Sequence, residues 1–520
     1  MFVRVLKFSL SVIAVFAVVW IATLLWWQSI NRMPTSTDIV THLFLLPAGM
    51  IAAYLVIRGA LDGIRRNVVA MRATPAAATE AAQAGGELPE TQSDDPTRRW
   101  HAPVLASALR STHGAGAAMT LAALVAQKRP EVGDALHDGN PLYAAPIAEL
   151  DMDLDATRAA LRQIDAELDW SDEAVRMVAL AADISQRLLA EAFARYPRLF
   201  PAPAAASAAQ SEPIHLVLTL LLPRATDPTH QAAAAGLVRQ QLAALWPVDR
   251  ITLEPLAARG DADALLLLDR AVTTLNRQPE RVVRALVAAE SLIGERAVAS
   301  LRHHDKLFGP DCPHGVVPAE AAAGLLLAPP VASFASEIGV DDASAPTQLG
   351  RACVARLDAP SADKGLPRTV VLANLIAQAV NQLTPAAQTP DNQDKHGDNA
   401  SAAASDAAEP QPPEIGAVLA DIVPHPVRTL EVARVFSDRF PDRDLSTDLL
   451  PVGAACGYTG AASALLCVAL AHQMTQEAGA PVLAISASDA QQRGAIAMSP
   501  PAGADVEAPQ DAQDAAAVAA

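Results

Sequence analysis

The stretch Pro451–Ser499 constrains the fold of this chain more than any other segment. It begins with a glycine-rich turn, Gly453 to Gly460, which opens an apolar segment of helical length. Two short runs of β-type residues follow, Val482–Ser486 and Ala495–Met498, and a polar turn joins them. Because glycine allows close backbone approach, such a turn normally brings the backbone near another element or a ligand. The pattern predicts a buried helix beside a pair of short strands.

An earlier stretch, Val282–Ala328, looks like a counterpart of the first. Between and around the two, strand-like apolar runs alternate with helical segments. The strand-like runs are Ile214–Leu222, Val282–Ala288, Val317–Leu327 and Ile415–Ile422, and the helical segments are Gln231–Leu245 and Val427–Phe440. Arg368–Leu383 has a strand-then-helix pattern. Leu265–Asp269 fits either a strand or the start of a helix. This alternation predicts an α/β layered domain over residues 214–498 with a largely buried sheet.

The region 98–200 is predicted to be mainly helical. Leu105–Val125 and Ala156–Ala194 have apolar residues at spacings of three and four. Ser171, followed by two acidic residues, is a predicted helix N-cap. Whether this region is an independent domain stays open. Composition further predicts a linker over 73–97, a disordered insertion over 384–414 and a disordered tail over 499–520.

The N-terminal residues 1–72 predict two transmembrane helices with basic flanks. Phe8–Trp27 is a run of twenty residues without a charge, which is long enough to cross a hydrocarbon core of about 30 Å. Ile39–Ile57 is a second apolar run. A cleaved signal peptide is disfavoured because the first run is too long and a second one follows. Lys and Arg flank both ends of the hairpin, so we expect a multi-pass membrane protein with its large domain in the cytoplasm.

Composition excludes several classes of function. The net charge is −18 and no basic cluster occurs beyond residue 72, so nucleic acid is not an expected partner. The four cysteines form no C-x-x-C pair, and we expect them to be small buried residues in a reducing compartment. The motifs of nucleotide hydrolysis, serine hydrolysis and zinc proteolysis are absent. We therefore expect no cofactor, no metal and no small-molecule substrate.

Short motifs in both halves resemble those of one known family. Val287–Ser291, followed by Pro313–Ala322 and Gly324–Leu327, is similar to the end of the first half of a thiolase-like, or β-ketoacyl-synthase-like, fold. Cys456–Ala462, which reads CGYTGAA, resembles the G-H-T-G-A-A turn of the second half, and Ile485–Met498 resembles its last β-hairpin. The resemblance implies a layered αβαβα domain, preceded by the membrane hairpin and the helical region.

The reacting groups of that family are not matched. Its chemistry needs a cysteine nucleophile on a turn before a helix, with two histidines or a histidine and an asparagine. The corresponding stretch, residues 257–264, contains no cysteine or serine, and Tyr458 stands at one histidine position. The other position matches His425 and Asp421 about equally well. We predict no catalytic residue and a remnant site with four candidates, His425, Cys456, Tyr458 and Gly460; Cys456 is either a small buried residue or a displaced nucleophile.

The order of parts, two membrane spans before a helical region and a degenerate thiolase-like domain, resembles the lipase-adapter family of bacterial type VI secretion systems. That resemblance implies a non-catalytic adapter, anchored in the bacterial inner membrane, that binds a phospholipase effector and assists its loading onto the secretion spike protein. The alternatives are an acyl transferase or condensing enzyme that uses Cys456 with His425 or Tyr458, and a membrane scaffold unrelated to secretion.

Overall fold

The computed structural model describes residues 95–130, 132–133, 142–147, 152–200, 213–278, 281–341, 345–358, 360, 367–383 and 414–501. The predicted membrane hairpin, and almost all of the predicted linker, insertion and tail, lie outside these residues. Within them, no helix combines the length and the apolar character needed to cross a membrane.

The first half of the sheet contains five long strands. They are β1 (Ala102–Ser111), β5 (His215–Leu222), β6 (Ile251–Ala257), β7 (Val282–Ser291) and β8 (Glu320–Leu327). Their order in space is β6-β5-β7-β8-β1. The strands β5, β6 and β7 are parallel, whereas β8 is antiparallel to both β7 and β1. Almost every residue of β7 and β8 is buried, as expected for strands covered on both faces.

The second half repeats this arrangement. Its strands are β9 (Thr347–Leu349), β10 (Cys353–Arg356), β11 (Ala417–Ala420), β12 (Leu449–Pro451), β13 (Val482–Ser486) and β14 (Gln492–Ser499). Here β11 is parallel to β12 and β13, and β14 lies antiparallel between β13 and the pair β9 and β10. The strands of each half can be numbered 1 to 5 along the chain, with β9 and β10 counted together as strand 1 of the second half. Both halves then have the same spatial order, 3-2-4-5-1. A short pairing of β1 with β9 joins the halves into one sheet.

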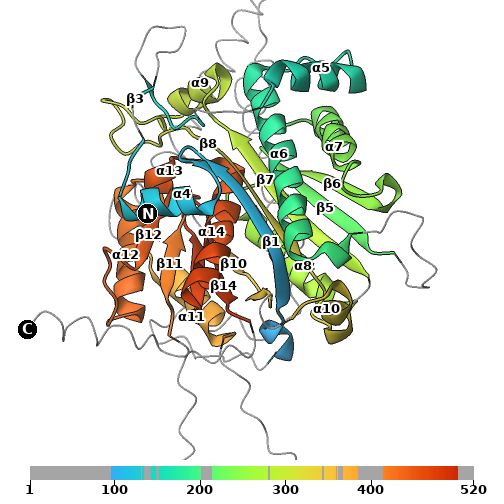
Figure 1. Cartoon of the computed structure of the whole chain (residues 1–520). Helices are drawn as coiled ribbons and strands as arrows, with labels where there is room; N and C mark the ends of the chain where they lie inside the picture. The colour runs from blue at the N-terminus through green and yellow to red at the C-terminus, as the bar shows by residue number, and fades with distance from the viewer. Residues whose placement is uncertain are drawn as a thin grey trace, which may run out of the picture. The chain divides into compact units, whose positions relative to one another are not determined.

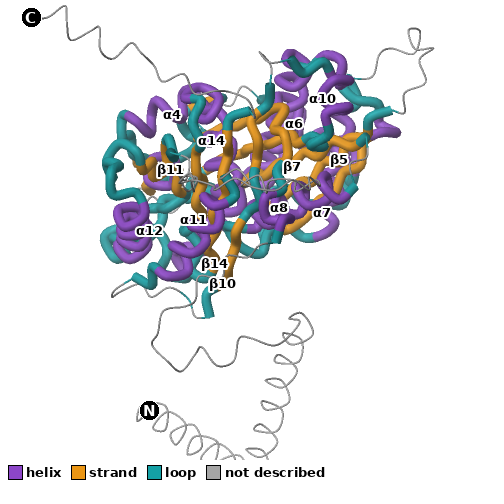
Figure 2. The backbone as a smooth tube through the Cα atoms, turned by 90° about the horizontal axis from the view of Figure 1, so that it is seen from below, coloured by secondary structure: helices purple, strands orange, loops and turns teal. Residues whose placement is uncertain are grey.

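Helices cover both faces of each half (Figure 2). The outer face of the first half carries α6 (Asp172–Arg195) and α7 (Pro228–Leu242), and that of the second half carries α11 (Val370–Asn381) and α12 (Pro426–Arg439). Two helices, α8 (Asp263–Arg277) and α14 (Ser463–Ala478), pack against strands of both halves. The layers therefore follow the predicted αβαβα order.

The smaller elements lie around this core. They are α4 (Ala117–Val125), α5 (Leu154–Ile164), α9 (Glu295–His303), α10 (Ala332–Ile338), α13 (Val452–Cys456), β2 (Gly114–Ala115), β3 (Val132–Gly133), β4 (Leu142–Tyr143) and short 3-10 turns at Pro96–Arg99, Pro197–Leu199, Val248–Arg250 and Gly460–Ala462.

The prediction for the region 98–200 needs correction. The first part of Leu105–Val125 is the strand β1, and only α4 at its end is helical. Figure 1 shows β1 running between α14 and α6, near the middle of the molecule. The region is therefore part of the layered core and does not merely precede it. Most residues of β1 are buried, so its apolar residues lack the alternation that separates a strand from a helix in a sequence.

Other local predictions can also be compared with the structure. Ser171 caps α6 as predicted, because its side chain accepts a hydrogen bond from the Ala174 backbone N–H at 3.2 Å. The segment at Leu265–Asp269 belongs to the helix α8. Arg368–Leu383 contains the helix α11 but no strand, so the strand predicted there was wrong.

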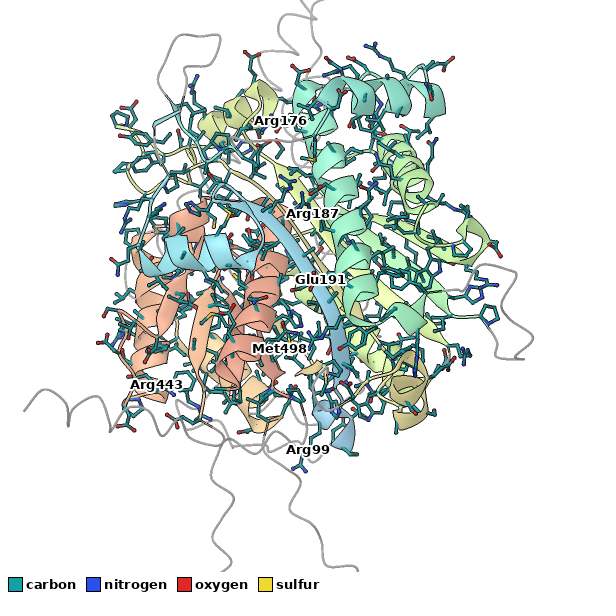
Figure 3. The ribbon with its side chains drawn as sticks, viewed as in Figure 1. Arg99, Arg176, Arg187, Glu191, Arg443 and Met498 are labelled. Atoms are coloured by element: carbon teal, nitrogen blue, oxygen red, sulfur yellow. The ribbon has the colours of Figure 1, made fainter. Side chains whose placement is uncertain are left out.

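Two ion pairs with buried carboxylates connect the layers. The Arg493 guanidinium on β14 donates to both carboxylate oxygens of Glu431 on α12, at 2.9 Å each, and the two side chains are 0% and 2% exposed. Arg176, near one end of α6 (Figure 3), donates to Glu320, the first residue of β8. Ser291 and the Ile147 backbone N–H also donate to Glu320. Each buried carboxylate is thus satisfied by charge-assisted hydrogen bonds.

Candidate functional site

A cleft of about 740 Å³ lies beyond the carboxyl ends of β5, β6 and β7. The loops that follow these three strands line it, together with the start of α6, the turn after α13 and the turn between β13 and β14. The carboxyl ends of parallel strands meet at one edge of a sheet, which is where α/β proteins commonly bind ligands. This is the candidate functional site.

The backbone of the turn after α13 determines where Tyr458 lies. Gly457 has φ of +80°, and a Cβ added there would lie 2.8 Å from the Ala319 Cβ, so only glycine fits without strain. The Tyr458 N–H donates to the Val317 carbonyl at 2.8 Å, and the Ala319 N–H donates to the Tyr458 carbonyl at 3.1 Å. The segment before β8 therefore holds the predicted residue Tyr458 at the cleft.

Tyr458 is hydrogen-bonded to Asp261, which belongs to the loop between β6 and α8. Its phenol donates to the Asp261 Oδ1 at 3.0 Å. Burial raises the pKa of Asp261 to about 7, and the nearby carboxyls of Asp489 and Asp421 act in the same direction. Burial and the Asp261 carboxyl raise the pKa of Tyr458 well above its usual range. The phenol therefore stays protonated and acts as a hydrogen-bond donor to the carboxyl.

A second buried carboxyl, that of Glu290, lies near the end of β7. Its Oε2 accepts a hydrogen bond from the Ala461 N–H at 3.2 Å. Gly460, with φ of +46°, allows this approach, because a Cβ there would lie only 2.7 Å from the same oxygen. Burial raises the pKa of Glu290 well above its usual range, and the Asp261 carboxyl adds to this effect.

Asp421 has a structural role beside the cleft. Its carboxylate accepts hydrogen bonds from the Ser486 hydroxyl at 2.6 Å and from the N–H groups of Ala487 and Ser488 at 2.7 and 3.0 Å. These bonds fix the turn between β13 and β14, which carries Asp489 to the cleft. Asp421 itself is not among the described residues that line the cleft.

The four predicted site residues divide into two pairs. Tyr458 and Gly460 line the cleft, whereas His425 and Cys456 are not among its described lining residues. His425 caps α12 by accepting a hydrogen bond from the Arg428 N–H at 3.5 Å. Cys456 is fully buried in the core, and burial raises the pKa of its thiol to about 12.

Asp261, Glu290 and Asp489 were not predicted as site residues. Asp261 lies in the stretch 257–264, which was noted because it lacks a nucleophile, and Glu290 lies in Val287–Ser291, which was noted as a motif of the family resemblance. The available signal was weak: Glu290 stands at the end of the apolar run of β7 and Asp489 follows that of β13 by three residues, positions where a sheet edge can face a cleft. Asp261 had no such signal, because the strand before it, β6, is not an apolar run. The part of the chain that the structure describes contains no group of three or more His, Cys, Asp or Glu placed to hold a metal ion.

Comparisons with known proteins bear on the fold. No protein-family model matches the chain, and no curated protein matches it by sequence. A type II polyketide-synthase ketosynthase, solved with its acyl-carrier protein and bound to the hexaketide, aligns over 77% of this chain and 99% of its own, with 10% identity and a TM-score of 0.51. The oxazolomycin ketosynthase domain OzmH KS7 of Streptomyces albus JA3453 aligns over 77% and 74%, with 12% identity and a TM-score of 0.50. The fold of this chain is therefore thiolase-like, as its motifs predicted.

Proposed function

We propose that this chain is a non-catalytic adapter, anchored in the bacterial inner membrane, that binds a phospholipase effector and assists its loading onto the type VI secretion spike. The observation that supports a non-catalytic role is the hydrogen-bonded pair Asp261–Tyr458. Asp261 lies two residues before α8, in the stretch where the family resemblance requires a cysteine nucleophile. A carboxyl bound to a protonated phenol does not supply the thiolate that acyl transfer needs.

The rest of the proposal depends on the sequence. The apolar runs Phe8–Trp27 and Ile39–Ile57, with their basic flanks, support the membrane anchor. The resemblance of the whole layout to type VI lipase adapters supports the choice of partners. A membrane anchor would raise the local concentration of the adapter near the secretion machine.

The rival function is acyl transfer through Cys456. A thiol with a pKa of about 12 is thiolate for only about one part in 10⁴ at pH 8. To test this, the full-length chain and its Cys456→Ala variant are incubated with radiolabelled acyl-CoA. We expect no label on either protein, and saturable labelling that depends on Cys456 would overturn the proposal.

The adapter role is tested by affinity capture of the full-length chain from membranes of its native cells, followed by mass spectrometry. The matched control is an unrelated membrane protein carrying the same tag at the same expression level. We expect a secreted lipase and a spike protein to be enriched over this control. Repeated captures that enrich neither protein would refute the adapter role.

The anchor is tested separately by cell fractionation. The full-length chain is expected in the membrane fraction after carbonate washing, and a variant that lacks residues 1–72 is expected to lose this association. Recovery of the full-length chain in the supernatant would refute the anchor, whatever the result of the capture experiment.

A further inference from the structure

Two carboxyl groups of the cleft are buried without a paired cation among the described residues. Asp261 is 8% exposed and Glu290 is 5% exposed. Asp261 accepts one hydrogen bond, from Tyr458, and Glu290 accepts one, from the Ala461 N–H. Within the described part of the chain, no hydrogen bond or ion pair reaches the second oxygen of either carboxyl group. A buried carboxylate is costly unless it is paired, so burial of these groups favours either the protonated form or a bound cation.

An aromatic ring with an unused donor lies in the same cleft. Trp170 is 5% exposed and lines the cleft. Its indole N–H is buried and has no hydrogen-bond partner in the described structure. The His230 ring packs against it edge-on, with 4.6 Å between the ring centroids. Tryptophan is the side chain that attracts organic cations most strongly through its ring face, and its buried N–H leaves an unsatisfied donor in the wall of the cleft.

We propose that this cleft binds an organic cation, an alkylammonium or guanidinium group, between the carboxylates of Asp261 and Glu290, with Trp170 and Tyr458 lining the site. A metal ion fits less well, because no described set of three ligating side chains surrounds the position. A guanidinium carries five N–H donors in one plane and can meet several carboxylate oxygens at once. The inference concerns a ligand rather than a substrate, and it does not depend on the adapter role.

The cation has two possible sources. One is a free small amine, and the other is a lysine or arginine side chain of a polypeptide bound at the cleft. The cleft volume of about 740 Å³ accommodates either. Four exposed basic residues also line the cleft: Arg224, Arg259, Arg296 and Lys306. Because they are exposed, solvent and salt screen their repulsion of a cation, whereas the buried carboxylates act in a lower dielectric.

Protons compete with the proposed ligand. Asp261 faces the carboxyls of Asp489 and Asp421, the phenol of Tyr458 and the guanidinium of Arg428, while Glu290 faces Asp261 and the Glu173 carboxyl on α6. The net effect raises the pKa of Asp261 to about 7. About one tenth of Asp261 is then ionised at pH 6 and about nine tenths at pH 8. We therefore expect cation affinity to rise at least about tenfold between pH 6 and pH 8.

Binding is measured by isothermal titration of the purified full-length chain with two probes at pH 6 and pH 8. Agmatine represents the free small amine, and a blocked Gly-Gly-Arg-Gly-Gly peptide represents a polypeptide source. The variants are Glu290→Gln and Asp261→Asn, which keep the side-chain shape and remove the charge. The matched control is Asp249→Asn, because the Asp249 side chain is 80% exposed.

We expect at least one probe to bind more tightly at pH 8, with affinity reduced at least tenfold in both cleft variants and unchanged in the control. Tighter binding of agmatine assigns the site to a small amine, and tighter binding of the peptide assigns it to a polypeptide. If neither probe binds at millimolar concentration at pH 8, or if the cleft variants bind as the wild type does, the proposal is wrong. Thermal unfolding of each variant checks that lost binding is not lost folding.

Discussion

Replacing Asp261 with asparagine should make the protein more stable at neutral pH and remove part of its pH dependence. Burial raises the pKa of this carboxyl from 3.8 to about 7 in the folded chain. Between these pH values the folded state holds a proton that the unfolded state has released, so the stability of the wild type falls as pH rises. A pKa difference of about three corresponds to about 4 kcal/mol, lost progressively from pH 4 to pH 7. The asparagine side chain cannot ionise, and its oxygen can still accept the Tyr458 hydrogen bond.

The assay is urea unfolding of the full-length wild type and the Asp261→Asn variant between pH 4 and pH 8, followed by tryptophan fluorescence. The variant should gain stability over the wild type as pH rises, by an amount on the order of 4 kcal/mol above pH 7. The exposed control Asp249→Asn should show no comparable trend. A difference between Asp261→Asn and wild type that stays constant over the whole pH range would refute the reasoning, because it would mean that Asp261 is ionised normally in the folded state.

Two further substitutions test the packing. Arg493→Ala leaves Glu431 buried without its partner and should lower the unfolding free energy by about 3–5 kcal/mol; a urea midpoint close to that of the wild type would contradict the buried pair. Gly457→Ala should cost about 1–3 kcal/mol from its positive φ alone, and more because its Cβ would meet Ala319 at 2.8 Å. Gly116→Ala is the control, because Gly116 has a similar backbone conformation, with φ of +95° and ψ of 160°, but nothing within 4 Å of an added Cβ; equal losses at both glycines would show that the contact with Ala319 does not matter.

Much of the layered core could be predicted because its signals are local. The strands β5, β7 and β13 are mostly apolar runs of strand length, and a run of that kind is typical of a buried strand. The strand β1 was missed because its apolar residues have no distinguishing period. The strand β6 was missed although it alternates, because Pro255 counts against a strand everywhere except at a sheet edge, which is where β6 lies.

The site was predictable only in part, for a related reason. Tyr458 and Gly460 belong to a short motif that can be identified within a few residues of sequence. Asp261 and Glu290 are 29 positions apart, and they form a site only because the fold brings distant segments to them. Tyr458, nearly 200 residues away from Asp261, donates a hydrogen bond to it, and the Ala461 N–H donates one to Glu290. Sequence patterns also say nothing about how far burial shifts a carboxyl pKa, because that depends on what the fold places around it.

The position of β1 has a consequence for how the chain is made. Within the described residues, β1 is the first long strand to leave the ribosome, yet its neighbour β8 begins more than 200 residues after β1 ends. During translation at about 5–20 residues per second, this apolar strand waits for at least about ten seconds without its final partner. A nascent chain of this kind is prone to aggregation and a natural client for chaperones that hold apolar segments. Folding of the first half should thus be completed late in synthesis, and stalling translation before residue 327 should leave β1 accessible to protease.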